Sequence, residues 1–149
     1  MKRATKKRTR NKKYQSYDVL KLLIALYPSD NIHTTPRELV EVIHDVLDGA
    51  WPDTKLFEPC HFYLSYNRWM SNDLVTDLTN MELAGLLSVC IDTSPVNTQF
   101  WLSIKPKCRN CLKTYWKKEV PPADLKLLRD LSCKLHKEIE RRKKNEPPQ

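Results

Sequence analysis

The chain has 149 residues, 40% of them hydrophobic, which is enough for one domain with a single core and short tails. No apolar run approaches the roughly 18 residues that span a bilayer, and the basic N-terminus leads into a polar stretch rather than the apolar region of a signal peptide. Five cysteines are an odd and sparse set for a secreted disulfide framework. These totals predict a soluble intracellular protein with reduced thiols and no membrane contact.

The formal net charge of +8 is unevenly distributed. Residues 1–13 contain eight Lys or Arg and no acid, which gives +8. Residues 14–102 contain four basic and twelve acidic residues, which gives −8, and residues 103–149 contain fourteen basic and six acidic residues, which gives +8 again. Basic ends around an acidic middle indicate a polyanionic partner, nucleic acid above all.

The first structural prediction is a division into four parts. Residues 1–13 lack a hydrophobic pattern and repel one another, so they are expected to be a disordered basic tail. A folded core is expected over residues 14–104. A basic segment with a CxxC and a C-terminal helix is expected over residues 105–144, followed by a frayed tail over residues 145–149.

The helices of the core begin with Tyr17–Tyr27, which is apolar nearly all round and is expected to lie at the centre. Thr35 followed by Pro36 predicts the start of a second helix, which Gly49 closes. Residues Phe57–Trp69 are rich in aromatics and predict either a strand or a buried irregular segment.

A third helix is predicted between a capping Ser71 and Gly85. Its expected inward residues are Leu74, Val75, Leu78, Met81 and Leu83. Two short β-prone runs, Leu86–Ile91 and Gln99–Ile104, then predict a β-hairpin with a long loop, in which Cys90 is expected to belong to the core.

The last predicted helix follows Pro121-Pro122 and runs roughly from Ala123 to Lys143. Its apolar face is expected to consist of Leu125, Leu128, Leu131, Leu135 and Ile139. The fold class is therefore mainly α with a small β-hairpin.

Three helices and a hairpin in this order resemble a winged-helix domain over residues 17–104. The most specific part is similar to the pattern S-x-x-L-x-x-D-L-x-x-L-x-x-x-G-L-I of many prokaryotic winged-helix proteins, which include regulators and toxin-antitoxin-associated domains. The matching residues are Ser71, Leu74, Asp77, Leu78, Met81, Gly85, Leu86 and Leu87. The resemblance implies a winged-helix-like core plus a C-terminal helix.

In such a family the third helix would enter the major groove with basic or amide side chains. Here it carries Asp73, Asp77 and Glu82, and no Lys or Arg occurs between Arg68 and Lys105. We therefore expect the acidic core to bind a protein partner or to dimerise, while the flanks contact nucleic acid.

Two basic regions are predicted to contact nucleic acid. The N-terminal tail combines eight cations, which suits phosphate binding or nuclear import, with a solubilising role as the alternative. Around the CxxC, aromatic residues interleave with cations, which is typical of single-strand binding, although the aromatics could also belong to the core. The predicted contact residues are Lys2, Arg3, Lys6, Lys7, Arg8, Arg10, Lys12, Lys13, Lys105, Lys107, Arg109, Lys113 and Trp116.

A CxxC and a later CxxH predict one structural zinc, because zinc prefers four Cys or His ligands supplied as two close pairs. The predicted ligands are Cys108, Cys111, Cys133 and His136. Cys60 and His61 are the alternative second pair. The other interpretations are a buried filler thiol with a surface histidine, or a redox pair, which lacks the surrounding thioredoxin-like pattern.

The order Phe100-Trp101, CxxC, Tyr115-Trp116 behind a basic N-terminal region is also similar to the C-terminal part of the nuclear non-structural phosphoprotein of bocaparvoviruses. The resemblance covers about twenty residues, and three residues separate Cys111 from Tyr115 where that family has fewer. It implies viral RNA processing and replication in a host nucleus.

No enzyme motif is present. With two glycines in the chain, no phosphate-cradling loop can form, and neither G-x-S-x-G nor H-E-x-x-H occurs. We expect a non-enzymatic, nucleic-acid-associated regulatory or accessory protein of transcription, replication or RNA processing, acting on DNA or RNA. The alternative is a protein-interaction adaptor that binds its partner through the acidic core, with the basic tail serving only for nuclear targeting. The expected location is the nucleus, or the cytoplasm if the source is prokaryotic.

Overall fold

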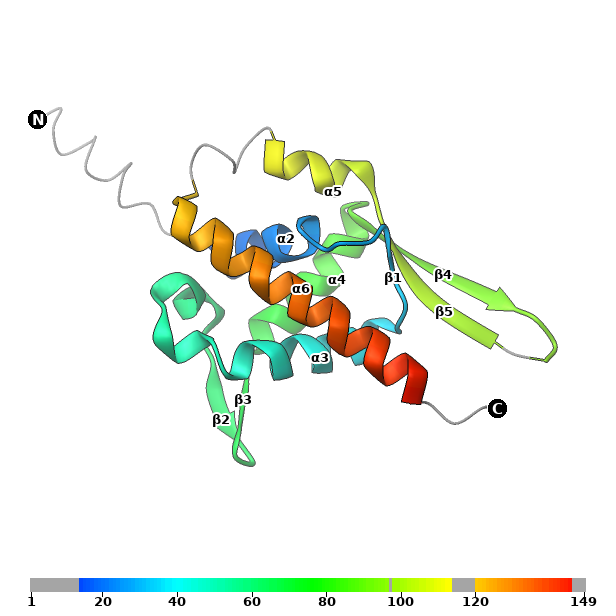
Figure 1. The fold of residues 1–149 in the computed structure, drawn as a ribbon, viewed down its shortest axis with the longest axis horizontal. Coiled ribbons are helices and arrows are strands. Elements are labelled where there is room, and N and C mark those ends of the chain that lie inside the picture. Colours follow the sequence, from blue (N-terminus) through cyan, green and yellow to red (C-terminus); the bar gives the residue numbers. More distant parts are fainter. Residues whose placement is uncertain (1–13, 97, 114–119, 146–149) are drawn as a thin grey trace, which may run out of the picture.

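The computed structural model describes residues 14–96, 98–113 and 120–145, so the predicted basic tail lies outside the described residues. The described chain is mostly helical with two small antiparallel sheets, which confirms the mainly α class (Figure 1). The elements follow one another as α2 (Ser16–Ala25), β1 (Asn31–Ile32), α3 (Pro36–Asp48), η1 (Trp51–Asp53), η2 (Lys55–Cys60), β2 (Tyr63–Ser65), β3 (Arg68–Met70), α4 (Asn72–Leu83), β4 (Leu87–Thr93), β5 (Thr98–Ile104), α5 (Pro106–Cys111) and α6 (Pro122–Asn145).

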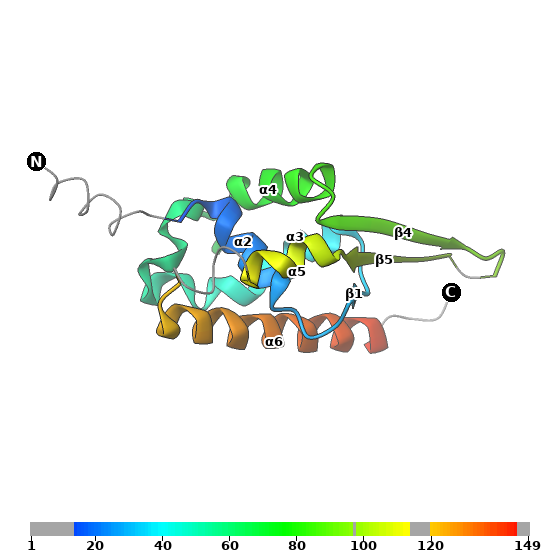
Figure 2. The ribbon, with the colours of Figure 1, turned by 90° about the horizontal axis from the view of Figure 1, so that it is seen from above.

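Helix α2 forms the centre of the core, as its all-round apolar sequence predicts. Its buried residues are Ser16, Val19, Leu20, Leu22, Leu23, Ile24 and Ala25. Helices α4, α5 and α6 all contact it. Figure 2 shows α4 on one side of the molecule and α6 on the opposite side, with α2 and α3 between them. This layering separates the surfaces of α4 and α6.

Helix α6 covers the other side of α2 and α3 with the leucine face that its sequence predicts. Leu128, Leu131, Leu135 and Ile139 are buried, while Leu125 is partly buried. The hydroxyl of Ser132 donates a hydrogen bond to the carbonyl oxygen of Leu23, at 2.9 Å. Burial of four large apolar side chains is worth several kcal/mol, so α6 is an integral part of the core.

The predicted hairpin is present as β4 and β5, and a two-residue strand that the sequence did not predict completes its sheet. β1 pairs with β5, so the strand order is β1-β5-β4 and all pairs are antiparallel. One face of the hairpin is apolar along its length, with the cross-strand pairs Leu87–Ile104, Val89–Leu102 and Ile91–Phe100. This face is buried at the base and exposed toward the tip, where Ile91 is 53% exposed.

Three residues predicted to be buried are not. Cys90 lies on the opposite face of β4 and is only partly buried, because the hairpin projects beyond the helices (Figure 1). On α4, Val75 and Leu83 are 43% and 81% exposed. Helix α4 packs on the body along one narrow stripe, and residues outside that stripe stay in solvent.

The start and end of α4 follow the sequence signals. The Ser71 Oγ accepts a hydrogen bond from the backbone N–H of Leu74, at 3.2 Å, which caps the helix. After the helix, Gly85 has a φ of 78°, a left-handed conformation that favours glycine.

The aromatic segment before α4 is part helix and part hairpin. Its first residues form the 3-10 helix η2, and its last form the strands β2 and β3. The tight turn between these strands places Tyr66 and Asn67 at positive φ, as a two-residue hairpin turn requires. Trp51 stacks on Phe62 and contacts Trp69 edge-on, which fastens the hairpin to the body.

Candidate nucleic-acid interface

Helix α5 and the residues directly beside it contain the predicted contact residues that the structure describes. It begins directly after β5, with Pro106 at its first position, and packs on α2. The predicted cations lie on or beside it, as do two of the predicted zinc ligands. These residues are Lys105, Lys107, Arg109, Lys113, Cys108 and Cys111.

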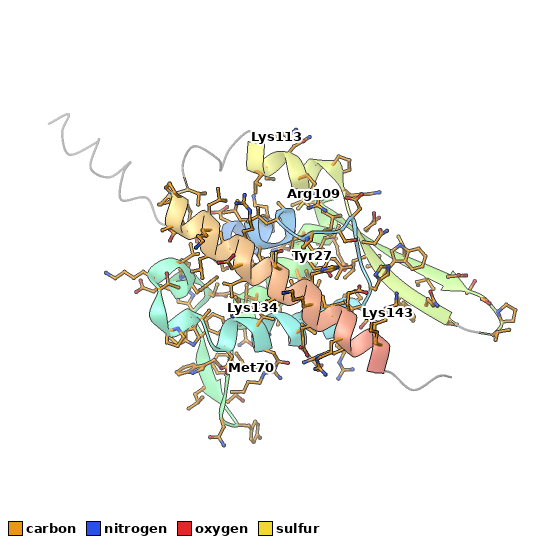
Figure 3. All side chains as sticks on the ribbon, in the orientation of Figure 1. Tyr27, Met70, Arg109, Lys113, Lys134 and Lys143 are labelled. Carbon is orange, nitrogen blue, oxygen red and sulfur yellow. The ribbon has the colours of Figure 1, made fainter. Side chains whose placement is uncertain are left out.

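Arg109 is bound to the end of α2 (Figure 3). Its guanidinium donates hydrogen bonds to the carbonyl oxygens of Ala25, Tyr27 and Ser29, at 2.9, 2.6 and 2.6 Å. It also lies 3.3 Å from a carboxylate oxygen of Asp30. The last carbonyls of a helix lack intrahelical partners, and a guanidinium there also favours the negative end of the helix dipole. This side chain therefore caps α2 and joins it to α5.

The other cations near α5 are more accessible. Lys107 donates a hydrogen bond to the carbonyl oxygen of Ala84, just after α4, at 3.3 Å. Lys105 and Lys113 are exposed. Only these last two offer ammonium groups that make no ion pair or hydrogen bond with the described residues.

The predicted zinc ligands lie on two different helices. Cys108 is completely buried on α5, and burial raises the pKa of its thiol to about 12. Cys133 is exposed on α6, and the ring of His136 contacts Tyr27 edge-on. Among the described residues, which include all four, no three His, Cys, Asp or Glu side chains are arranged to hold a metal ion. Zinc binding at these positions stays a prediction.

The alternative zinc pair is also divided between interior and surface. Cys60 is fully buried, and burial raises the pKa of its thiol to about 12. His61, the next residue, is exposed, and its Nδ1 lies 2.7 Å from a carboxylate oxygen of Asp73. The structure thus gives this pair no shared site.

The remaining predicted contacts, Trp116 and the eight cations of residues 1–13, lie outside the described residues. No protein-family model, curated protein or solved structure matches this chain. Within the described residues, none of the helices has the length and apolar character needed to cross a bilayer.

Of the three acids of α4, Asp77 is buried, whereas Asp73 and Glu82 are only partly buried and the Asp73 side chain is 46% exposed. Asp77 is buried and accepts a hydrogen bond from the hydroxyl of Ser16, and Asp73 pairs with His61. The exposed residues of the helix are instead uncharged: Asn72, Val75, Thr76, Thr79, Asn80 and Leu83. The acids are evident from the sequence, whereas the burial of Asp77 follows from its partner on α2.

Several exposed cations on α6 were missing from the sequence-based site. They are Lys126, Arg129, Lys134, Lys137, Arg141, Lys143 and Lys144. The leucine periodicity of this helix was used to predict its inner face, and the same helical projection would have placed these cations together on the outer one.

Proposed function

We propose that this protein is a non-enzymatic accessory or regulatory factor of transcription, replication or RNA processing that binds nucleic acid mainly through its basic flanks. The observation that carries the proposal is the separation of charge, +8 in residues 1–13, −8 in residues 14–102 and +8 in residues 103–149. Cations gathered in this way release counterions from a polyanion and bind it with little sequence preference.

The fold part of the proposal is a winged-helix core over residues 14–104. It is supported by the helix order α2, α3, α4 before the β4–β5 hairpin, and by the short strand β1, which pairs with β5 as the third strand of such a sheet does. The elements η1, η2, β2 and β3 between the second and third helices depart from the simplest form of that fold.

A salt titration tests the function. The full chain and a variant lacking residues 1–13 are titrated against duplex DNA, single-stranded DNA and RNA at several salt concentrations. We expect deletion to weaken binding to every probe and to lower the slope of log K against log salt, by about 0.9 per lost duplex phosphate contact. Absence of binding by the full chain at about 50 mM salt, where such contacts are strong, contradicts the proposal.

One observation favours the adaptor function as a second candidate. The outer half of the hairpin exposes Val89, Ile91, Val96 and Phe100, while Asp92 is the only charged residue between Leu87 and Ile104. An exposed apolar surface with little charge is typical of protein-binding sites. For an adaptor, Ile91→Ser with Phe100→Ser would abolish binding of a protein partner, whereas deletion of residues 1–13 would leave that affinity unchanged.

A further inference from the structure

The two faces of α6 have opposite chemistry. The inner face buries Leu128, Leu131, Leu135 and Ile139 against the body. The outer face exposes seven cations, and Asp130 is the only acid classed as exposed among the described residues of this helix. Figure 3 labels Lys134 near the middle of this helix and Lys143 near its end.

The spacing of the cations places several of them in one line along the helix. At about 100° per residue, Lys137 lies about 20° around the axis from Lys126, and Lys144 lies at the same angle as Lys126. With a rise of about 1.5 Å per residue, this line is roughly 27 Å long. Lys134 and Arg141 flank it on one side and widen it into a stripe.

The acids of α6 neutralise this stripe only in part, since Asp130 is exposed about 40° around the axis from Lys126 and Glu138 pairs with Arg141. Glu138 accepts hydrogen bonds from Arg141 and Arg142, and these donors lower the pKa of its carboxyl to about 2. Arg142 also pairs with Asp45 on α3, at 2.6 Å. Glu140 pairs with His33, at 3.2 Å. The Glu140–His33 and Arg142–Asp45 contacts therefore join α6 to the body, whereas Glu138 pairs within the helix.

The three lysines that define the line have no acidic partner among the described residues. Within the described residues, Lys126, Lys137 and Lys144 make no ion pair. The helix dipole favours cations in the last turn, which accounts for Lys144 and its neighbours. It does not account for Lys126 or Arg129 in the first half of the helix. An excess of unpaired cations along the whole length indicates an external anion.

The shape and composition of the face indicate which anion. Single-stranded nucleic acid is bound by cations combined with aromatic side chains that stack on the bases. Helix α6 contains no Phe, Trp or Tyr. A straight line of roughly 27 Å laid along a duplex spans about eight base pairs, at about 3.4 Å each along the axis, and crosses the phosphate backbones that border the grooves. The face therefore suits a duplex backbone.

The position of α6 determines on which side of the molecule the duplex would lie. Helix α4, the third helix of the core, lies on the opposite side of α2 and α3 (Figure 2). A duplex lying against the outer face of α6 does not contact α4. Binding through α6 is therefore a different mode from insertion of the third helix into the major groove.

We propose that the outer face of α6 is a phosphate-binding surface for duplex nucleic acid, centred on Lys126, Lys137 and Lys144. The proposal rests on the nucleic-acid-associated function proposed above and adds a site to it. It requires phosphate contact without base contact, so it predicts binding that is sensitive to salt and insensitive to sequence.

A pair of charge-reversal variants of the full chain tests the site. The test variant carries Lys126→Glu and Lys137→Glu on α6. The matched control carries Arg37→Glu and Lys55→Glu, which are exposed cations on α3 and η2. Both variants change the net charge by the same amount, so they differ only in where the charge is lost. Circular dichroism and thermal melting confirm that both remain folded.

Affinity is measured by fluorescence anisotropy with random-sequence DNA and RNA duplexes and with single strands of the same sequence. We expect the α6 variant to lose about tenfold in duplex affinity and the control less than about threefold. The salt slope of the α6 variant should fall by about 2, from about 0.9 for each of two phosphate contacts. DNA and RNA duplexes should be affected alike.

Failure of the α6 site, failure of the duplex assignment and failure of the proposed function give different results. Equal losses in the two variants, with strong binding by the unmodified chain, overturn the α6 site while leaving the proposed function with the N-terminal tail. Tighter binding of single strands than of duplexes, lost in the α6 variant, overturns the duplex assignment. No binding of any probe by the unmodified chain overturns the proposed function together with the site.

Discussion

The imidazole of His44 accepts a hydrogen bond at Nε2 from the backbone N–H of Ser71, at 2.9 Å. Its Nδ1 donates to the carbonyl oxygen of Val40, one turn earlier on α3, at 2.7 Å. This pattern identifies a neutral ring with its proton on Nδ1. Because the ring is completely buried, it fixes the start of α4 against α3.

Replacing this ring removes both a hydrogen bond and volume. We expect His44→Ala to lower the free energy of unfolding by about 2–4 kcal/mol, since it leaves a cavity and an unpaired Ser71 N–H. Urea denaturation measures the change. His33→Ala is the control, because His33 is exposed and pairs only at the surface, so a loss below about 1 kcal/mol is expected there. Similar losses in the two variants would contradict this role.

Arg109 provides the second prediction, because its role in the structure is to cap α2. Arg109→Ala should lower stability by about 2 kcal/mol, a typical value for hydrogen bonds from a charged donor. Arg109→Lys should recover less than half, because an ammonium lacks the planar fork that reaches several carbonyls at once. Lys113→Ala, at an exposed cation, should leave stability unchanged. Full rescue by lysine in thermal melting would show that charge alone matters.

Asp77 provides a pH-dependent prediction. Burial raises the pKa of its carboxyl, which the hydrogen bond from Ser16 only partly opposes. The folded state therefore favours the protonated form, and the penalty for ionisation is absent below the unfolded pKa of about 3.9 and develops as pH rises through the folded pKa. Asp77→Asn should be more stable than the unmodified chain at pH 7, and this difference should shrink on acidification. A difference that is constant from pH 7 to pH 4 in urea titrations would rule this out.

The elements with local signals were predictable from the sequence. Thr35 before Pro36 and the capping Ser71 each mark a helix start in a few residues, and both helices begin there. Strand β1 was missed because it has only two residues and exists through pairing with Leu102 and Ser103, about seventy positions away. No local pattern reports such a partner.

The candidate site was likewise predictable only in part from the sequence. The cations were visible in the sequence, but what each one binds was not. Arg109 had the same local setting as Lys113, yet only Arg109 meets the end of α2, more than eighty positions earlier. The acids of α4 were predicted to repel phosphates, whereas Asp77 faces the interior because α2 supplies Ser16 opposite it. Long-range partners, rather than composition, decided which charges remain available.

The zinc hypothesis makes a separate prediction. If Cys108, Cys111, Cys133 and His136 bind one zinc, native mass spectrometry of protein purified without chelator will show one zinc per chain, and Cys108→Ser or Cys133→Ser will remove it. Loading should increase with pH, because the buried Cys108 thiol, whose pKa is raised to about 12, must lose its proton. A mass without zinc rejects the site, and a zinc that survives both substitutions points to Cys60 and His61.

The outer face of α4 allows the decisive comparison with the usual winged-helix mode. Its amide and hydroxyl side chains are exposed and of types that can read base edges, but no Lys or Arg lies on this helix to hold phosphates beside them. We expect Asn72→Ala with Asn80→Ala to leave both affinity and sequence preference unchanged, because the proposed contacts lie on α6 and in residues 1–13. Binding to a library of random duplexes, followed by sequencing of the bound fraction, measures both quantities. Loss of a sequence preference in this variant, with stability unchanged in urea, would establish α4 as the recognition helix and make the α6 contact at most an accessory to it.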